Sequence, residues 1–279
     1  MSIDTDRVLL EFDNLWVHSQ RTIRTHSIKK SKEASNKIPM LSSIYQKWTS
    51  KLTGNASLDK EPSIHDRTLI SGANGTLLSG QVTVLTGASG SGKSVLLRVL
   101  AGLLPMSNGT IRLHDNDTSS NVYHDTHETA PIRWRQQVAL LAQHPQLLDG
   151  SVLENLQMPY QLHAHQPQTF DRDWHVAQLE HLDRSADFLQ QDAKHLSGGE
   201  RQLVNTLRLL QLSPQVLLLD EPTAALDIDT SAQLVNLLIN WLHADAQRTL
   251  LWVTHDIKDI MPLANRHWHM QAGVLTADS

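Results

Sequence analysis

The glycine-rich segment at residues 87–94 has residue types and a spacing that suit phosphate binding. Its sequence, GASGSGKS, fits the pattern G-x-x-x-x-G-K-[S/T] between residues 81–86, an expected strand, and residues 94–104, an expected helix. Glycines let successive backbone N–H groups turn toward phosphate oxygens, and the start of the helix adds positive potential. The sequence predicts a nucleotide site that consists of Gly87, Ala88, Ser89, Gly90, Ser91, Gly92, Lys93 and Ser94.

Within this segment, Lys93 carries the positive charge that suits the β- and γ-phosphates, and Ser94 carries a hydroxyl that suits Mg²⁺. The apolar run 216–219 precedes Asp220 and Glu221, so two carboxylates stand at the end of a buried strand. We expect Asp220 to hold Mg²⁺ and Glu221 to polarise the attacking water. Without the glycine-rich segment, two such acids would be interpreted as solvated turn residues.

A second anion-binding pattern lies at residues 196–202, LSGGERQ. Ser197, Gly198 and Gly199 place a hydroxyl and bare backbone amides before a helix that we expect to begin around Glu200. One bound nucleotide can use both helix starts only if the second start comes from another subunit. The pattern therefore predicts a site shared between two protein chains.

The order of these motifs resembles the nucleotide-binding subunits of ABC transporters. The resemblance includes Gln143, the SGGERQ and LLLDEP segments, Ala-Leu-Asp ending at Asp227, and Thr-His-Asp around His255. It implies that Gln143 contacts Mg²⁺ and relays the state of the Mg²⁺ site to a membrane partner. It further implies that Asp227 crosses to the second subunit and that His255 contacts the γ-phosphate.

The resemblance also implies the fold class: an α/β P-loop NTPase core with a mainly parallel sheet, an N-terminal antiparallel β layer and an inserted helical subdomain. We expect a single ABC ATPase domain over residues 1–279, with the helical signature subdomain at 146–212. A plausible capping box at Ser151 and Glu154 opens one helix there. Residues 267–275 are expected to form a closing hairpin that turns at Ala272 and Gly273.

Two positions depart from the family pattern. Val95 replaces the usual Thr that reaches the α-phosphate, which predicts weaker ATP binding but no loss of it. The adenine ring is usually stacked on an aromatic residue near the end of the first strand, which we expect over residues 7–17. Trp16 is the candidate here. Because a shift of one residue reverses the face of a strand, Trp16 could instead belong to the core, with His18 as the stacking residue.

Composition limits the remaining function classes. The chain has 279 residues, a net charge of −5 and no cysteine, which excludes disulfides and argues against a nucleic-acid partner. No apolar run reaches the roughly 20 residues that span a bilayer. We therefore expect a cytoplasmic protein that is peripheral to the inner (plasma) membrane through an integral-membrane permease.

Residues 19–66 form a basic insertion in an otherwise acidic chain. Between residues 19 and 60, nine Lys and Arg residues face two acids. Leu41, Ile44, Tyr45, Trp48 and Leu52 follow helical spacing, which predicts either a basic amphipathic helix on anionic lipid or the partner, or a helix packed on the protein itself. We favour the second alternative.

The sequence therefore predicts an ATP- and Mg²⁺-dependent ATPase subunit that pairs with a second copy of itself or a homologous subunit and drives a separate permease. Three short segments, at residues 134–138, 142–143 and 251–256, resemble small bacterial ATP-binding subunits of iron export. Two alternatives belong to other classes: a soluble ABC ATPase of an assembly or scaffold system, and an idle module that only dimerises on ATP.

Overall fold

The computed structural model describes residues 7–19, 67–114, 123–144, 146–165, 168–224, 226–255 and 260–277. The predicted amphipathic helix and almost all of the basic insertion, together with Ala225 and Asp256 of the motifs, lie outside these residues. Outside residues 19–67, the chain forms one compact unit, which is described below.

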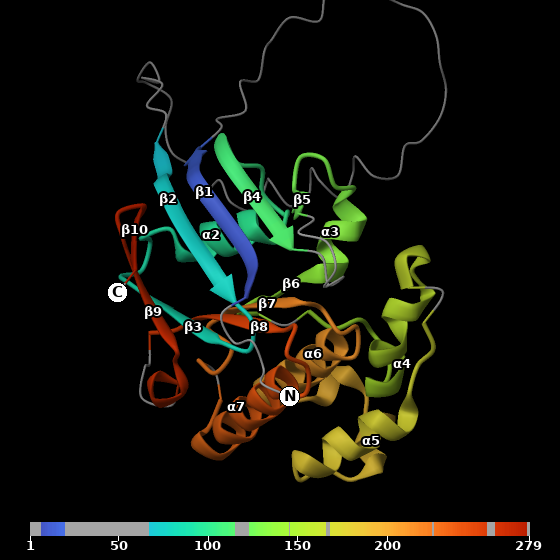
Figure 1. Cartoon of the computed structure of the whole chain (residues 1–279). Coiled ribbons are helices and arrows are strands. Elements are labelled where there is room, and N and C mark those ends of the chain that lie inside the picture. Colours follow the sequence, from blue (N-terminus) through green and yellow to red (C-terminus); the bar gives the residue numbers. More distant parts are fainter. Residues whose placement is uncertain are drawn as a thin grey trace, which may run out of the picture. The chain divides into compact units, whose positions relative to one another are not determined.

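Two sheets form the framework of this unit (Figure 1). An antiparallel sheet has the order β2-β1-β4-β5, and a six-stranded sheet has the order β10-β9-β3-β8-β7-β6. The strands are β1 (Val8–His18), β2 (Thr68–Leu78), β3 (Val82–Thr86), β4 (Asn108–His114), β5 (Tyr123–Asp125), β6 (Val138–Leu141), β7 (Val216–Asp220), β8 (Thr249–Val253), β9 (Arg266–Gln271) and β10 (Val274–Ala277). All pairs in the second sheet are parallel except β9 with β10. The predicted mainly parallel sheet, β layer and closing hairpin are confirmed.

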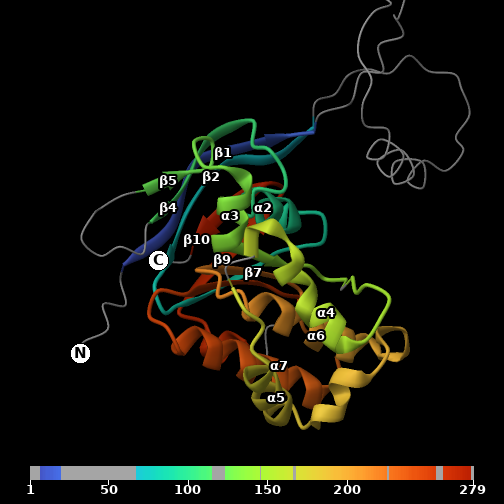
Figure 2. The same ribbon diagram turned by 90° about the vertical axis from the view of Figure 1, so that its right-hand side faces the viewer.

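Helices cover both faces of the six-stranded sheet, as the two views show (Figures 1 and 2). The helices are α2 (Lys93–Leu100), α3 (Pro131–Gln137), α4 (Val152–Gln157), α5 (Arg172–His181), α6 (Gly198–Leu210) and α7 (Ile228–His243). Short 3-10 turns are η2 (Met158–Gln161), η3 (His163–His165), η4 (Ala186–Gln190), η5 (Ala193–His195) and η6 (Met261–Leu263). The helical region expected before β7 is thus broken into short pieces.

The apolar side chains form two clusters, one on each face of the six-stranded sheet. Leu96 and Leu97 of α2 pack with Leu85 and Leu251 and with the antiparallel sheet. On the other face, α6 and α7 pack against the neighbouring positions of the same strands, including Val84 and Leu250. Because successive strand residues face opposite sides, each strand supplies both clusters. As a result, α2 and α6 lie on opposite faces of the sheet.

Three expectations need correction at the level of single elements. Helix α2 ends at Leu100 rather than 104, because Gly102 takes a positive φ of 65° just beyond it. Helix α6 begins at Gly198, two residues before Glu200. Strand β2 was not predicted, because its residues 72–75, GANG, have the composition of a turn. Gly75 is nevertheless required there, since a Cβ would stand 2.6 Å from Phe12 Cζ.

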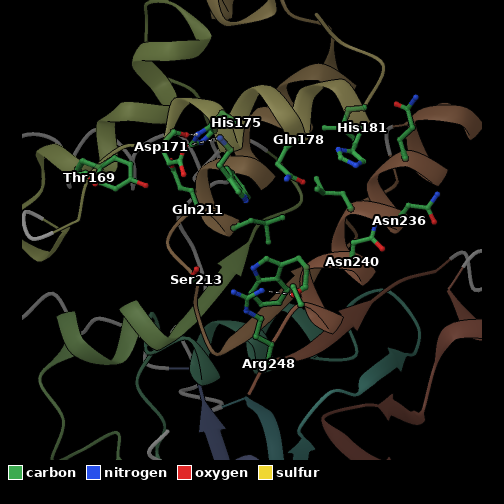
Figure 3. Close-up of a pocket in the computed structure, with 18 residues that line it drawn as sticks. Thr169, Asp171, His175, Gln178, His181, Gln211, Ser213, Asn236, Asn240 and Arg248 are labelled. Atoms are coloured by element: carbon green, nitrogen blue, oxygen red, sulfur yellow. Dashed lines mark hydrogen bonds between the residues drawn. The ribbon is translucent and has the colours of Figure 1, made fainter. Parts of the chain in front are cut away.

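A cavity of about 700 Å³ lies between α5, α7 and the end of α6 (Figure 3). Gln178, Asn240 and Arg248 line it, and none of the motif residues does. His175 also lines it, fully buried, with its ring stacked 4.5 Å from that of Phe170. Its Nδ1 lies 2.6 Å from the backbone oxygen of Asp171, so Nδ1 carries the proton and donates it. Burial lowers the pKa of His175 below its ordinary value of 6.5.

The neutral His175 predicts a dependence of stability on pH. Because the folded-state pKa is depressed, the unfolded chain binds the proton more readily, so stability is complete above pH 6.5 and falls as the pH drops through the unfolded value toward the folded one. Burial lowers the pKa of His114 in the same direction. Urea unfolding from pH 7.5 to 5 should show this loss.

The variant His175→Gln should show a smaller loss of unfolding free energy over that pH range. The control is His181→Gln, because His181 is exposed on the same helix and lines the same cavity. If the unfolding free energy of His175→Gln changes with pH as much as that of the unmodified protein, the neutral His175 is not the source of the pH dependence.

Candidate functional site

The glycine-rich segment connects β3 to α2 and is held by two neighbouring backbones. Gly92 has a φ of 115°, and a Cβ there would stand 2.9 Å from the backbone oxygen of Leu69 in β2. The backbone N–H of Gly273, in the β9–β10 turn, donates to the oxygen of Ser91 at 2.8 Å. Glycine is therefore required at position 92 by both conformation and space.

Lys93 is the first residue of α2, and its ammonium group lies within the loop. Its Nζ donates to the backbone oxygens of Gly87 at 2.7 Å and Ala88 at 3.0 Å. Burial lowers the pKa of Lys93, whereas Glu221 and Asp220 act in the opposite direction. The loop residues Ala88, Ser89 and Gly90 are exposed, so an anion can approach the cation from this side.

Ser94 and Asp220 bring two hard oxygen ligands together. The Ser94 hydroxyl donates to Asp220 Oδ1 at 3.1 Å, and Asp220 is 8% exposed at the end of β7. None of the ion pairs recorded among the described residues includes Asp220, although the carboxylate is near enough to Lys93 to oppose the lowering of its pKa by burial. A hydroxyl and a carboxylate next to a phosphate-binding loop fit Mg²⁺ by ligand type.

Glu221 stands at the centre of the polar cluster. Its Oε1 lies 2.8 Å from His255 Nε2, and its Oε2 accepts from Gln143 Nε2 at 2.9 Å. Gln143 follows β6, Glu221 follows β7 and His255 follows β8, so the carboxyl ends of three neighbouring parallel strands place all three groups. Glu221 has a positive φ of 51°, a strained conformation for a residue with a side chain.

Ser197 begins α6 as the predicted anion-binding pattern requires. Its hydroxyl accepts from Glu200 N at 3.2 Å, and Glu200 Oε2 accepts from Ser197 N at 2.9 Å. Ser197 and Gly198 are exposed, and a Cβ on Gly198 would meet nothing within 4 Å. Among the described residues, no recorded hydrogen bond or ion pair joins residues 197–199 to the loop at 87–94. One chain does not bring the two anion-binding helix starts together.

Asp227 caps the start of α7. Its carboxylate accepts from the backbone N–H and the hydroxyl of Thr230, each at 2.8 Å, and these hydrogen bonds lower the pKa of Asp227. The next residue, Ile228, is 87% exposed. This turn packs on the start of α6, since a Cβ on Gly199 would lie 3.2 Å from Leu226 Cδ2.

Trp16 and His18 share one face of β1. Leu15 and Val17 are buried on the other face, so the alternative that places Trp16 in the core is wrong. The Trp16 indole donates to Asn14 Oδ1 at 2.8 Å, and its centroid lies 6.1 Å from that of His18. Strand β2 connects this face to the phosphate loop, since Gly72 lies under Trp16 and Leu69 lies against Gly92.

The contacts of Leu69 and Gly273 with the loop were not predicted, nor was the close approach of the Met270 backbone to Gly87. The turn at Ala272 and Gly273 could be predicted, but no local signal shows which distant backbone a turn will contact.

Known proteins match this chain along most of its length. A family model described as ABC transporter matches residues 70–224. The protein "Probable iron export ATP-binding protein FetA" of Escherichia coli is 35% identical over 198 residues, which cover 70% of this chain and 81% of that protein. "Methionine import ATP-binding protein MetN 1" of Pseudomonas fluorescens is 36% identical over 71% of this chain but 57% of its own length.

Solved structures share the fold. A dimeric ATP-binding cassette in a post-hydrolysis state with ADP and Pi has a TM-score of 0.69 at 18% identity, covering 97% of this chain and 98% of its own. The cbiO1 protein of Clostridium perfringens has a TM-score of 0.65 at 19% identity, covering 97% of this chain and 88% of its own. The chain belongs to the ABC transporter ATPase family, and its fold is that of an ABC ATPase.

The first prediction from the site concerns adenine. Trp16→Ala should weaken ATP binding by about 1–3 kcal/mol, roughly five- to 150-fold in Kd, because a stacking surface is lost. Trp16→Phe should restore most of this affinity. His18→Ala should have the smaller effect, and calorimetric titration checks all three. An effect of His18→Ala larger than that of Trp16→Ala would reverse the assignment.

The second prediction concerns Val95, in the first turn of α2. Val95→Thr should tighten ATP binding up to about tenfold, because one additional hydrogen bond contributes about 0.5–1.5 kcal/mol. Val95→Ala shortens the side chain without adding a donor and should give no gain. If Val95→Thr and Val95→Ala give the same Kd for ATP, the added threonine hydroxyl makes no contribution and the prediction is wrong.

Proposed function

We propose that this ABC ATPase couples ATP hydrolysis to a separate membrane permease and that its active form contains two ATPase subunits. The observation that carries the proposal is the placement of Glu221 between Gln143 and His255, beside the Ser94–Asp220 pair. The family membership supports ATP as the substrate. Residues 1–279 are treated as one ABC domain with the insertion at 19–66 and the helical subdomain at 146–212.

The phosphate chain of ATP would lie in the loop at residues 87–94. The loop amides and the start of α2 would bind its oxygens, and Lys93 would exchange its bonds to Gly87 and Ala88 for bonds to the β- and γ-phosphates. Trp16 would stack on adenine, and Val95 would line the α-phosphate region without a hydrogen bond.

Ser94, Asp220 and Gln143 are the residues that would hold Mg²⁺. When bound, this ion neutralises phosphate charge and favours an in-line geometry. Glu221 would accept a hydrogen bond from the attacking water and draw its proton away as the bond from the water oxygen to the γ-phosphorus forms. The bond from that phosphorus to the β–γ bridging oxygen would break in the same step, with ADP as the leaving group. His255, 2.8 Å from Glu221, would donate to a γ-phosphate oxygen, and Lys93 would stabilise the charge that develops there.

A second subunit would complete the site. Ser197, Gly198 and Gly199 of that subunit would cover the γ-phosphate with a hydroxyl and backbone amides. Asp227 and the exposed Ile228 would lie at the contact between the subunits. Contacts made only with ATP bound would favour closure, and hydrolysis would release the pair.

The permease would dock beside α3. Leu103, Ile132, Leu148 and Leu162 are each more than half exposed. Arg135 donates to Gly102 O at 2.8 Å and Gln136 to Ala164 O at 2.6 Å, so α3 connects the segments that carry Leu103 and Leu162. Large exposed apolar side chains of this kind suit contact with a partner helix.

No helix in the described part of the chain is long and apolar enough to cross a bilayer. We therefore place the spanning segments in the permease and this chain on the cytoplasmic face of the inner membrane. For cargo, iron export is the assignment we favour, because the chain spans 81% of the FetA protein and about 57% of the methionine importer. Transport by a reconstituted permease complex tests it.

The substitution Glu221→Gln tests hydrolysis. Turnover should fall by about 10²–10⁴, because the group that polarises water is lost, while the Kd for ATP stays close to that of the unmodified protein. Phosphate release measures the turnover, and calorimetric titration measures the Kd for ATP. The matched control is Glu180→Gln, an exposed carboxylate on α5, which should keep full turnover. Undiminished phosphate release by Glu221→Gln would refute the catalytic assignment.

A further inference from the structure

Arg208 is a partly buried cation without a recorded acidic partner in the described residues. It lies near the end of α6, and one of its terminal nitrogens donates to Gln146 O at 2.8 Å and to Asn205 Oδ1 at 2.6 Å. Burial lowers the pKa of Arg208, and no neighbouring charge opposes this effect. Desolvating a guanidinium is unfavourable, so the two hydrogen bonds must offset part of that cost.

The backbone that Arg208 holds belongs to the catalytic segment. Gln146 follows Gln143 by three positions, and Gln143 Nε2 donates to Glu221 Oε2 at 2.9 Å. The hydrogen bond from Arg208 therefore connects the end of α6 to the segment that carries a group in contact with Glu221.

The opposite end of α6 is the start that would cover the second subunit's nucleotide. The helix runs for 13 residues from Gly198, with Ser197 as its N-cap. At 1.5 Å per residue, Ser197 and Arg208 are about 16 Å apart along the axis. Leu203, Val204 and Leu207 between them are all buried in one cluster, so the helix is packed along its length and should move as a rigid element.

We propose that Arg208 is a positioning residue that couples the two nucleotide sites of the ATPase pair. The proposal rests on the shared site described under Proposed function. An ATP bound by the partner contacts Ser197 of this chain, and α6 transmits that contact through Arg208 and Gln146 to Gln143 and Glu221 of this chain's own site. Occupation of one site thereby positions the catalytic groups of the other. Such coupling is reciprocal, so each ATP should favour the other.

The structure offers a matched control on the same helix end. The side-chain Nε2 of Gln211, just beyond α6, donates to Leu156 O at 2.8 Å and to the backbone oxygen of Arg208 at 3.1 Å, and so connects this end to α4 with no recorded bond to the described residues of the Gln143 segment. Figure 3 shows Gln211 near Asp171, among the residues that line the cavity. Loss of the Gln211 hydrogen bonds should loosen packing at the C-terminal end of α6 but leave the hydrogen bond from Arg208 to Gln146 in place.

The experiment measures ATP hydrolysis against ATP concentration for the full chain, the variants Arg208→Lys and Gln211→Met, and the melting temperature of each. Lysine keeps the charge but replaces the planar fork by a single flexible ammonium. Arg208→Lys should lower the Hill coefficient toward that of independent sites and raise half-saturating ATP by about fivefold or more. Gln211→Met should keep the cooperativity of the unmodified protein.

A second measurement covers the possibility that Arg208→Lys folds poorly. Arg208→Met keeps the apolar stem of the side chain. A double-mutant cycle of Arg208→Met with Ser197→Ala reports whether the two ends of α6 interact, because independent positions give additive effects on the logarithm of half-saturating ATP.

Non-cooperative hydrolysis by the unmodified protein, unchanged cooperativity in Arg208→Lys, equal loss in Gln211→Met, or additivity in the cycle would each overturn the proposal. These outcomes are separable from failure of the proposed function, since Glu221→Gln would still abolish turnover in a protein whose sites do not communicate.

Discussion

The separation of two anion-binding helix starts within one chain is the constraint on which the account depends. Helix α2 begins at Lys93 and packs on one face of the six-stranded sheet, and α6 begins after Ser197 and packs on the other. Among the described residues, no recorded hydrogen bond or ion pair joins the two helix starts. A sheet covered on both faces fixes this separation, because neither helix can cross it. A second subunit is the simplest way to bring both starts to one phosphate chain.

The sheet that separates the helices also assembles the catalytic cluster. Parallel strands end at the same edge, so Gln143, Glu221 and His255 meet there although they are far apart in the sequence. The strained backbone of Glu221, with φ 51°, holds its carboxylate between the other two groups. Through Arg208, the same edge is also connected to α6, so the catalytic geometry and the subunit contact share one framework.

Local patterns explain what the sequence could reveal. The glycine-rich loop, the apolar runs of β7 and β8, and the capping box at Ser151 each combine residue type with short-range spacing, and the structure shows them as expected. Strand β2 was missed because its glycines resemble a turn in the sequence. Gly75 is needed for a different reason: the ring of Phe12, about sixty positions away, leaves no room for a side chain there. The contact of Leu69 with Gly92 and that of Arg208 with Gln146 likewise depend on tertiary packing. The face of Trp16 could be settled only once the register of β1 was known.

The most direct test of the shared site mixes two variants that are each inactive. Ser197→Arg blocks the start of α6, which would cover the partner's nucleotide, but leaves Glu221 intact. Glu221→Gln removes the catalytic carboxylate but leaves the start of α6 intact. In a mixed pair, one site then combines the intact Glu221 of one subunit with the intact Ser197 of the other. The account predicts that mixing equal amounts restores turnover to no more than about a quarter of the wild-type value, because half of random pairs are mixed, each has one complete site, and Ser197→Arg removes the coupling that positions Glu221 in that site. A mixture that forms pairs with ATP yet remains as inactive as its separate components would contradict the shared site.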